Sequence, residues 1–482
     1  MHTDLENCSI ALVPQRSRGK KLPQYVAALS VCMGALAAGA VLGWTGNISE
    51  DMKKFSYNGI EIDDDSLGWI GSMATLGAAA ACIPIGKLCD MIGRKIAMLS
   101  LAIPFTIGWM LIIFANSLTI LSIGRFLTGM AGCAFCVSAP IYTSEIAEKD
   151  IRGALGSYFE FLLATGIALS FGVAMITDIK SYTIIMAILP LIFVIIFMFQ
   201  PESPIYLLKL NKEDKARAAL LRLRGNSYDI DAEIREIKND LLEEQNCNIS
   251  PLQSLRKKGT KISILVCFSL MFFQQACGIT AVVFYADSIF TSAGSKLDPK
   301  VSTLILGLME AIATFAGTIV VDRLGRRILL ISSTFVVGIS GAVLGIFFTL
   351  QDRHLVDEDA LLALGYVPVI SLCLFVIMFS IGIGPIPWLI SAELFPPEIR
   401  SIATGAAATL NWFTGFLITK FYLDLKNAVG SDVTFYIFSV ISVIGTVFIF
   451  LFVPETKGKS LNEIQKELNE DDMKESIEKS RM

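Results

Sequence analysis

Long apolar stretches alternate with short polar segments along most of the chain. Two of the stretches, TIIMAILPLIFVIIFMF (183–199) and ILLISSTFVVGISGAVLGIFFTL (328–350), carry no charge. A helix of about 20 apolar residues crosses a ~30 Å hydrocarbon core and pairs its own backbone groups, as lipid requires. The pattern predicts an all-α membrane protein with twelve spanning helices, near residues 24–44, 66–86, 96–115, 120–141, 154–177, 182–199, 262–286, 301–321, 328–350, 364–390, 401–423 and 433–453.

Composition agrees with this pattern, because 54% of the residues are hydrophobic and only 17% are charged. A soluble domain has about 25% charged residues. The N-terminal segment lacks the short apolar region and cleavage site of a signal peptide, so the first span is expected to be an uncleaved insertion signal. We therefore expect a multi-pass protein, with the plasma membrane as its location.

The basic residues predict the orientation of the helices. With both termini cytoplasmic, the inner segments hold 31 of the 40 Lys and Arg residues, as the preference of positive charge for the cytoplasm requires. The first outer loop is acidic, with Asp63, Asp64 and Asp65 in a row. Asn47 begins a glycosylation sequon, Asn-Ile-Ser, at the outer side, but so near the first span that its use is disfavoured.

Three motifs occur twice in the same order. CDMIGRK (89–95) is repeated as VDRLGRR (321–327), SEIAEKDIRGALG (144–156) as AELFPPEIRSIATG (392–405), and PESP (201–204) as PETK (454–457). Such repeats predict two parallel six-helix halves with a substrate between them, as in several transporters. The expected divisions are an N-terminal tail (1–23), a first bundle (24–204), a cytoplasmic linker (205–261), a second bundle (262–455) and a C-terminal tail (456–482).

The linker is highly charged, yet Ile230, Ile234, Ile237 and Leu241 have helical spacing. This predicts short surface helices. A disordered charged segment is the alternative.

The repeated charges fall at the inner ends of the predicted helices. We expect them to form an ion-pair gate that holds the halves together at the cytoplasmic side, since exposed pairs of about 1 kcal/mol or less can open and close. The alternative is that they only mark topology. The residues concerned are Asp90, Arg94, Glu145, Arg152, Asp322, Arg326, Glu393, Arg400, Glu202 and Glu455.

The sequence shows no pattern of residues typical of a catalytic or metal-binding site. There are only two histidines, His2 and His354, and no ATP-binding loop. Cys133 and Cys136 form a C-x-x-C inside an apolar helix, which is typical of close helix packing rather than of a metal or redox site. We expect no enzyme activity, no cofactor and no metal.

Further motifs carry a resemblance to a known family. They are GRF (124–126), PIYTSEIA (140–147), PESPIYLL (201–208), QQACGITAVVFYA (274–286), GIGPIPW (382–388) and PETKGKS (454–460). Together they resemble the sugar porter family of the major facilitator superfamily, over about residues 24 to 460. Within it the chain is most similar to insect facilitated trehalose transporter-like proteins.

The resemblance implies a sugar site near mid-membrane. Gln274 and Gln275 would hydrogen-bond hydroxyl groups, because an amide both donates and accepts. Trp388 would pack on a sugar ring, Asn411 would add a further amide, and Tyr285 would help to close the outer side. The alternative for the two glutamines is a role as interhelical hydrogen bonds.

Several positions depart from the family pattern. Thr280 replaces an asparagine, Glu310 replaces an asparagine and Glu160 replaces a glutamine. A charge in mid-membrane costs roughly 2.5–3.5 kcal/mol, so the two acids should have a role. They could bind sugar, carry a coupled proton or bind a cationic substrate. They could also be neutral, or paired with a residue such as Arg125. Thr45 stands where proton-driven relatives carry an aspartate, which favours uniport.

The function expected is facilitative transport of a hexose or a trehalose-like disaccharide by alternating access. The alternatives are a proton-coupled symporter using Glu160 or Glu310, and a non-transporting sugar receptor. The expected partners are a sugar and the lipid bilayer, with no nucleic acid, and a monomer should suffice.

Overall fold

The structure is a computed structural model that describes residues 19–148, 150–246, 251–396, 398–457, 459 and 463. The first half of the chain forms α1 (Leu22–Gly43), α2 (Ser49–Phe55), α3 (Asp64–Ile92), α4 (Arg94–Ser100), α5 (Ala102–Ile113), α6 (Leu118–Ile146), α7 (Arg152–Ile176) and α8 (Ile179–Phe197). Four shorter helices follow: α9 (Pro204–Lys209), α10 (Glu213–Arg224), α11 (Ile230–Asn246) and α12 (Pro251–Ser254). The second half forms α13 (Lys258–Ala276), α14 (Ile279–Phe284), α15 (Ala286–Ser292), α16 (Pro299–Leu324), α17 (Arg326–Asp352), α18 (Glu358–Ala363), α19 (Val367–Ile381), α20 (Ile386–Leu394), α21 (Arg400–Val429) and α22 (Ser431–Phe452).

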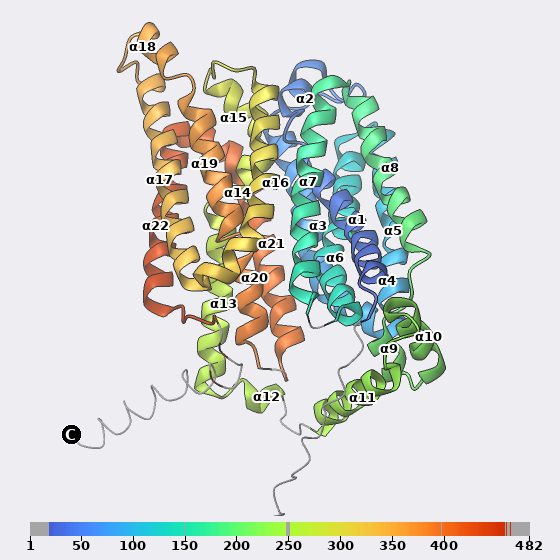
Figure 1. The fold of residues 1–482 in the computed structure, drawn as a ribbon. Coiled ribbons are helices and arrows are strands. Elements are labelled where there is room, and N and C mark those ends of the chain that lie inside the picture. The colour runs from blue at the N-terminus through green and yellow to red at the C-terminus, as the bar shows by residue number, and fades with distance from the viewer. Residues whose placement is uncertain are drawn as a thin grey trace, which may run out of the picture.

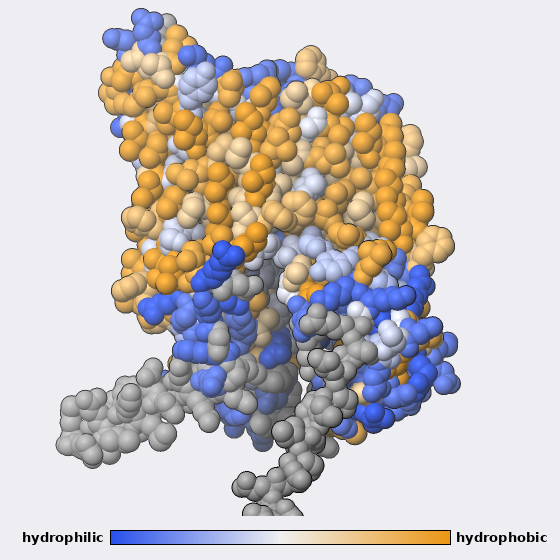
Figure 2. Space-filling model, viewed as in Figure 1, coloured by the Kyte–Doolittle hydropathy of each residue, from blue (hydrophilic) through white to orange (hydrophobic). Residues whose placement is uncertain are grey.

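The two sets of long helices stand side by side, and α10 to α12 lie beneath them at one end (Figure 1). We call this the linker end, and the opposite end, which carries α2 and α18, the α2 end. The halves meet mainly where α3 contacts α21 and where α7 contacts α16. A broad apolar band covers the long helices, and hydrophilic residues gather at the linker end (Figure 2). This is the surface that a bilayer requires.

Eleven helical stretches in the described residues are long and apolar enough to span a membrane. The helix predicted near 401–423 forms as part of α21, but it is not among the eleven. Its middle turns contain Thr409, Asn411 and Thr414, which lower the mean hydropathy. A helix that lines a polar interior can tolerate this loss.

The first repeated motif forms a turn between two helices in each half. Gly93 between α3 and α4 has φ 98°, and Gly325 between α16 and α17 has φ 91°, a region that favours glycine. Next to each glycine lies the glutamate of the PESP or PETK motif. Glu202 accepts from the backbone N–H of Lys95 at 3.0 Å, and Glu455 accepts from that of Arg326 at 3.1 Å. The glycine turn and the PESP or PETK glutamate thus occur together in each half, because the carboxylate caps the N-terminus of the helix that follows the turn.

The pKa of Glu455 reflects this cap. Burial alone would raise the pKa, but backbone N–H groups of Lys457, Arg326 and Arg327 favour the charged form and hold the pKa below its usual value. Glu202 and Glu455 were predicted to be gate residues. In this state their hydrogen bonds stay within one half and cap a helix, and the gate role stays a prediction.

Replacing either glutamate should destabilise its half. Loss of a helix cap costs about 1 kcal/mol, so Glu202→Ala and Glu455→Ala are each expected to lower the melting temperature in detergent. Glu213→Ala, which removes one member of an exposed ion pair with Lys238, is the matched control and should leave it nearly unchanged. Equal melting temperatures for all three variants would contradict the capping role.

The helices between the halves pack on the first half. Leu208, Ala216, Leu220 and Ile234 form a small apolar cluster that joins α9, α10 and α11. Arg224, at the end of α10, is buried and donates to the carbonyl oxygen of Ile146 at 2.7 Å, which ties the cluster to α6.

Candidate functional site

A cavity of about 900 Å³ lies between the two halves. Its walls come from α1, α3, α6 and α7 on one side and from α13, α14, α16, α19, α20 and α21 on the other. Lys87 and Asp90, near the end of α3, place one limit of the cavity at the linker end. Figure 2 shows a hollow between the halves at that end.

All seven residues that the sequence suggested for substrate binding line this cavity. Glu160 comes from α7, in the first half, and the other six come from the second half. They are Glu160, Gln274, Gln275, Thr280, Glu310, Trp388 and Asn411.

Three amide side chains form one hydrogen-bonded group in the wall. Asn411 on α21 donates to the carbonyl oxygen of Met271 at 2.8 Å and to Oε1 of Gln274 at 2.6 Å. Gln275 donates to Oδ1 of Asn411 at 3.0 Å and accepts from the hydroxyl of Thr280. The predicted alternative, that the glutamines join helices, therefore describes part of what these side chains do.

The amides differ in the hydrogen-bonding capacity that they leave open. Gln274 uses both N–H groups on the carbonyl oxygens of Ile383 (3.0 Å) and Gly384. Gln275 donates one N–H group to Asn411. Among the described residues, its second N–H group has no hydrogen-bonding partner. Gln275 is thus the glutamine with a free donor for a cavity occupant.

A break in the second half shapes the wall near Trp388. Helix α19 ends at Ile381 and α20 begins at Ile386, so the backbone between them is turned. Irregular backbone at membrane depth is tolerated where it is buried in protein or lines a cavity. Gln274 satisfies two of its carbonyl oxygens, and Trp388, two residues into α20, is half-buried in the cavity wall.

Glu160 and Glu310 have no charged partner in the described residues. Oε2 of Glu310 is buried and lacks a hydrogen-bonding partner. The predicted alternative of a pair with Arg125 is wrong. Arg125 is fully buried, donates to the carbonyl oxygens of Ile70 (3.1 Å) and Val41 (3.0 Å) and lies over the ring of Trp44.

The cavity is closed at the α2 end by contacts between the halves. Lys420 on α21 pairs with Asp65 on α3, and Lys300 on α16 pairs with Asp51 on α2 at 2.6 Å. Tyr285, the predicted outer gate residue, does not line the cavity. It is buried at this end, where its hydroxyl donates to the carbonyl oxygen of Thr419 at 2.8 Å.

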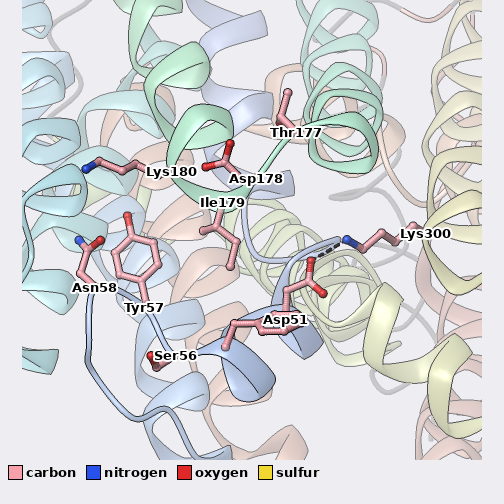
Figure 3. Close-up of a pocket in the computed structure, with 10 residues that line it drawn as sticks. Asp51, Ser56, Tyr57, Asn58, Thr177, Asp178, Ile179, Lys180 and Lys300 are labelled. Atoms are coloured by element: carbon pink, nitrogen blue, oxygen red, sulfur yellow. Dashed lines mark hydrogen bonds and ion pairs between the residues drawn. The ribbon is translucent and has the colours of Figure 1, made fainter.

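A second, smaller hollow of about 460 Å³ lies at the α2 end. Figure 3 shows the Asp51–Lys300 pair on one side of it and Tyr57, Asn58 and Lys180 on the other. Tyr57 and Asn58 already donate to backbone carbonyl oxygens near the end of α5. These side chains fix the local structure, so the hollow does not replace the central cavity as a candidate site.

At the linker end, the ion pairs of the repeated charges stay within each half. Arg94 pairs with Glu145 at 2.9 Å and with Asp90 at 3.1 Å in the first half. Arg326 pairs with Glu393 at 3.4 Å in the second half. In this state, in which the linker end is open, these printed pairs among the described side chains each lie within one half, so they do not form the predicted clamp between halves.

The remaining gate candidates are placed as follows. Arg152 is exposed at the start of α7. Arg400 lines the cavity and donates to the carbonyl oxygen of Phe395 at 3.2 Å. The side chain of Asp322 lies outside the part of the chain that the structure describes.

Asn47 is fully buried between α1 and α2, and its amide donates to the carbonyl oxygen of Phe171 at 2.8 Å. The buried Asn47 side chain is not accessible to a glycan in this conformation, which agrees with the expectation that use of the sequon is disfavoured.

Sequence reasoning missed several cavity residues. Lys87, Cys82, Cys136 and Trp412 all line the cavity. Cys136 was interpreted as a packing residue, and the other three were not singled out. Helical spacing offered the only signal, because Lys87 lies one turn before Asp90 on the same helix.

Comparison with known proteins supports one family. Residues 27–468 match the family described as "Sugar (and other) transporter". Facilitated trehalose transporter Tret1 of Polypedilum vanderplanki is 34% identical over 92% of this chain and 88% of its own length. Tret1 of Anopheles gambiae is 35% identical over 92% of this chain, which spans only 56% of that protein's length.

Solved structures show the same fold. The xylose transporter XylE from E. coli, in a partially occluded inward-open conformation, superposes with a TM-score of 0.76 at 22% identity, covering 91% of this chain and 99% of XylE. Its inward-open conformation gives a TM-score of 0.74 at 21% identity, covering 91% and 98%. With the family match over most of its length and a curated relative at 34% identity, the chain belongs to the sugar transporter family.

Proposed function

We propose that the protein is a facilitative sugar transporter that works by alternating access. The observation that carries the proposal is the central cavity, which lies between duplicated halves and is open at one end and closed at the other. Rocking of the halves about the cavity would expose it to the α2 end. The relatives named as trehalose transporters support a sugar substrate.

The cavity wall suits a neutral polyol. The amides offer donors and acceptors, and Trp388 offers an aromatic ring. A volume of about 900 Å³ is near the upper limit of the ~300–1,000 Å³ usual for small-molecule sites, so a hexose or a disaccharide fits.

Orientation follows from the charged linker. Positive charge favours the cytoplasmic side, so the linker end would face the cytoplasm and the α2 end the outside, with the plasma membrane as the site of action. In that orientation the structure represents an inward-open state.

Uniport is favoured by the surroundings of Arg125. This buried cation is held by two backbone carbonyl oxygens and the ring of Trp44. Thr45, next to Trp44 in the chain, stands where proton-driven relatives carry an aspartate, and a threonine hydroxyl cannot take up and release a proton during transport. A proton-coupled cycle is the second candidate, because Glu160 and Glu310 face the cavity.

Uptake into sealed proteoliposomes separates the two candidates. Counterflow of glucose or trehalose should occur at the same rate with or without an imposed pH gradient, and no sugar should accumulate above equilibrium. Accumulation driven by the gradient would establish symport. Binding without any counterflow would instead indicate a receptor.

A further inference from the structure

Glu160 and Glu310 place two carboxyl groups on opposite sides of the seam between the halves. Their helices, α7 and α16, are in contact, and the rings of Phe161 and Phe315 meet across the seam with centroids 5.5 Å apart. Both carboxyl groups line the central cavity.

The protein itself does not satisfy these groups. Glu310 is only 8% exposed, and its Oε2 atom has no hydrogen-bonding partner in the described residues. Among the described residues, neither a hydrogen-bond donor nor a cation contacts Glu160. The other charged residues of the cavity wall, Lys87, Asp90 and Arg400, lie near the helix ends at the linker end.

The chemistry of an occupant follows from what the pair lacks. A buried carboxylate is costly unless it is paired with a charge and accepts hydrogen bonds. A proton would remove charge but leave the remaining oxygens without donors. A hydroxyl would supply a donor but no charge. A protonated amine supplies one positive charge and up to three N–H donors, enough to bridge two carboxylates.

We propose that Glu160 and Glu310 form a cation subsite that selects sugars carrying a protonated amino group, the hydroxyl groups being bound by Gln275 and its neighbours. The inference rests on the proposed function, because it assumes that a sugar occupies the cavity. It assigns the two acids to recognition of the substrate rather than to proton coupling.

Competition tests the wild-type protein without any substitution. D-Glucosamine, N-acetyl-D-glucosamine and D-glucose would compete for uptake of a labelled neutral sugar in proteoliposomes, at a pH where the free amine is protonated. We expect glucosamine to inhibit at concentrations about tenfold or more below those of both neutral sugars, since bonds to charged groups are the stronger ones.

Two variants test whether the acids cause this preference. Glu160→Gln and Glu310→Gln keep the side-chain shape and remove the charge, and each should reduce the ratio of glucosamine to glucose affinity about tenfold. The ratio is informative even if the absolute rates change. Thermal melting identifies a variant that does not fold. In that case the other variant and the wild-type competition still test whether the acids cause the preference for glucosamine.

The outcomes separate the inference from the proposed function. Equal inhibition by glucosamine and glucose, or a preference that both variants retain, would overturn the cation subsite while leaving sugar transport intact. Accumulation of neutral sugar under a pH gradient that Glu310→Gln abolishes would assign the acids to protons and likewise overturn it. No uptake or counterflow of any sugar would overturn the proposed function, and the subsite with it.

Discussion

Gln275→Ala is expected to reduce sugar uptake at least tenfold while the protein still folds and inserts. The substitution removes the amide donor that remains open to the cavity, and it leaves Oδ1 of Asn411 and the hydroxyl of Thr280 without their partner. A sugar hydroxyl that loses its amide partner in the complex costs about 1–3 kcal/mol, which corresponds to roughly 5- to 150-fold in affinity. Initial uptake rates in proteoliposomes, normalised to reconstituted protein, measure the effect.

Two other glutamines serve as controls for this prediction. Gln200→Ala removes a hydrogen bond to Ser30 outside the cavity wall and should leave uptake nearly unchanged. Gln274→Ala should lower the melting temperature as well as uptake, because Gln274 satisfies backbone carbonyl oxygens at the break between α19 and α20. Uptake by Gln275→Ala at the wild-type rate would remove Gln275 from the proposed binding site.

The fold was largely predictable because a bilayer constrains it. Uninterrupted apolar runs had to be helices, and the paired motifs pointed to two related halves. The helix α21 shows the limit of hydropathy. Its middle carries Asn411 and neighbouring threonines, which lower its hydropathy. The membrane tolerates these polar side chains because this part of the helix lines the cavity rather than facing lipid.

The lining of the cavity was predictable where a resemblance supplied the positions. Glu160, Gln275 and Trp388 lie far apart in sequence, and only the packing of the halves brings them to one cavity. Partners of charged groups were not predictable. The repeated motif around Glu202 suggested a gate, yet the carboxylate caps a helix, and a residue list cannot distinguish a backbone donor from a nearby arginine.

The closed α2 end also escaped prediction. The acidic run 63–65 was recognised as an outer loop, but two of its partners lie more than 350 positions away in α21. Lys420 pairs with Asp65, and Asn427 donates to Asp64 at 2.8 Å. Pairings between halves depend on the conformational state, so no local pattern in the chain encodes them.

Gly46→Val is expected to prevent the α2 end from closing and to reduce transport strongly. Gly46 lies where the halves touch, and its carbonyl oxygen accepts from the backbone N–H of Asp287 at 2.9 Å. A Cβ atom on Gly46 would lie 2.2 Å from the carbonyl oxygen of Val283, so the helices would have to move apart. Overpacking costs about 1–3 kcal/mol or more, which shifts a two-state equilibrium by roughly 5- to 150-fold toward the state open at the α2 end.

Paired spin labels at exposed positions of α2 and α18 would measure this shift as a longer distance, alongside the uptake rate. Gly153→Val is the matched control, since nothing lies within 4 Å of a Cβ atom there, and it should change neither the distance nor uptake. Because the contact at Gly46 forms only when the α2 end closes, the variant should still fold and bind sugar from the α2 side. A Gly46→Val protein with wild-type distances and uptake would show that this contact does not take part in alternating access.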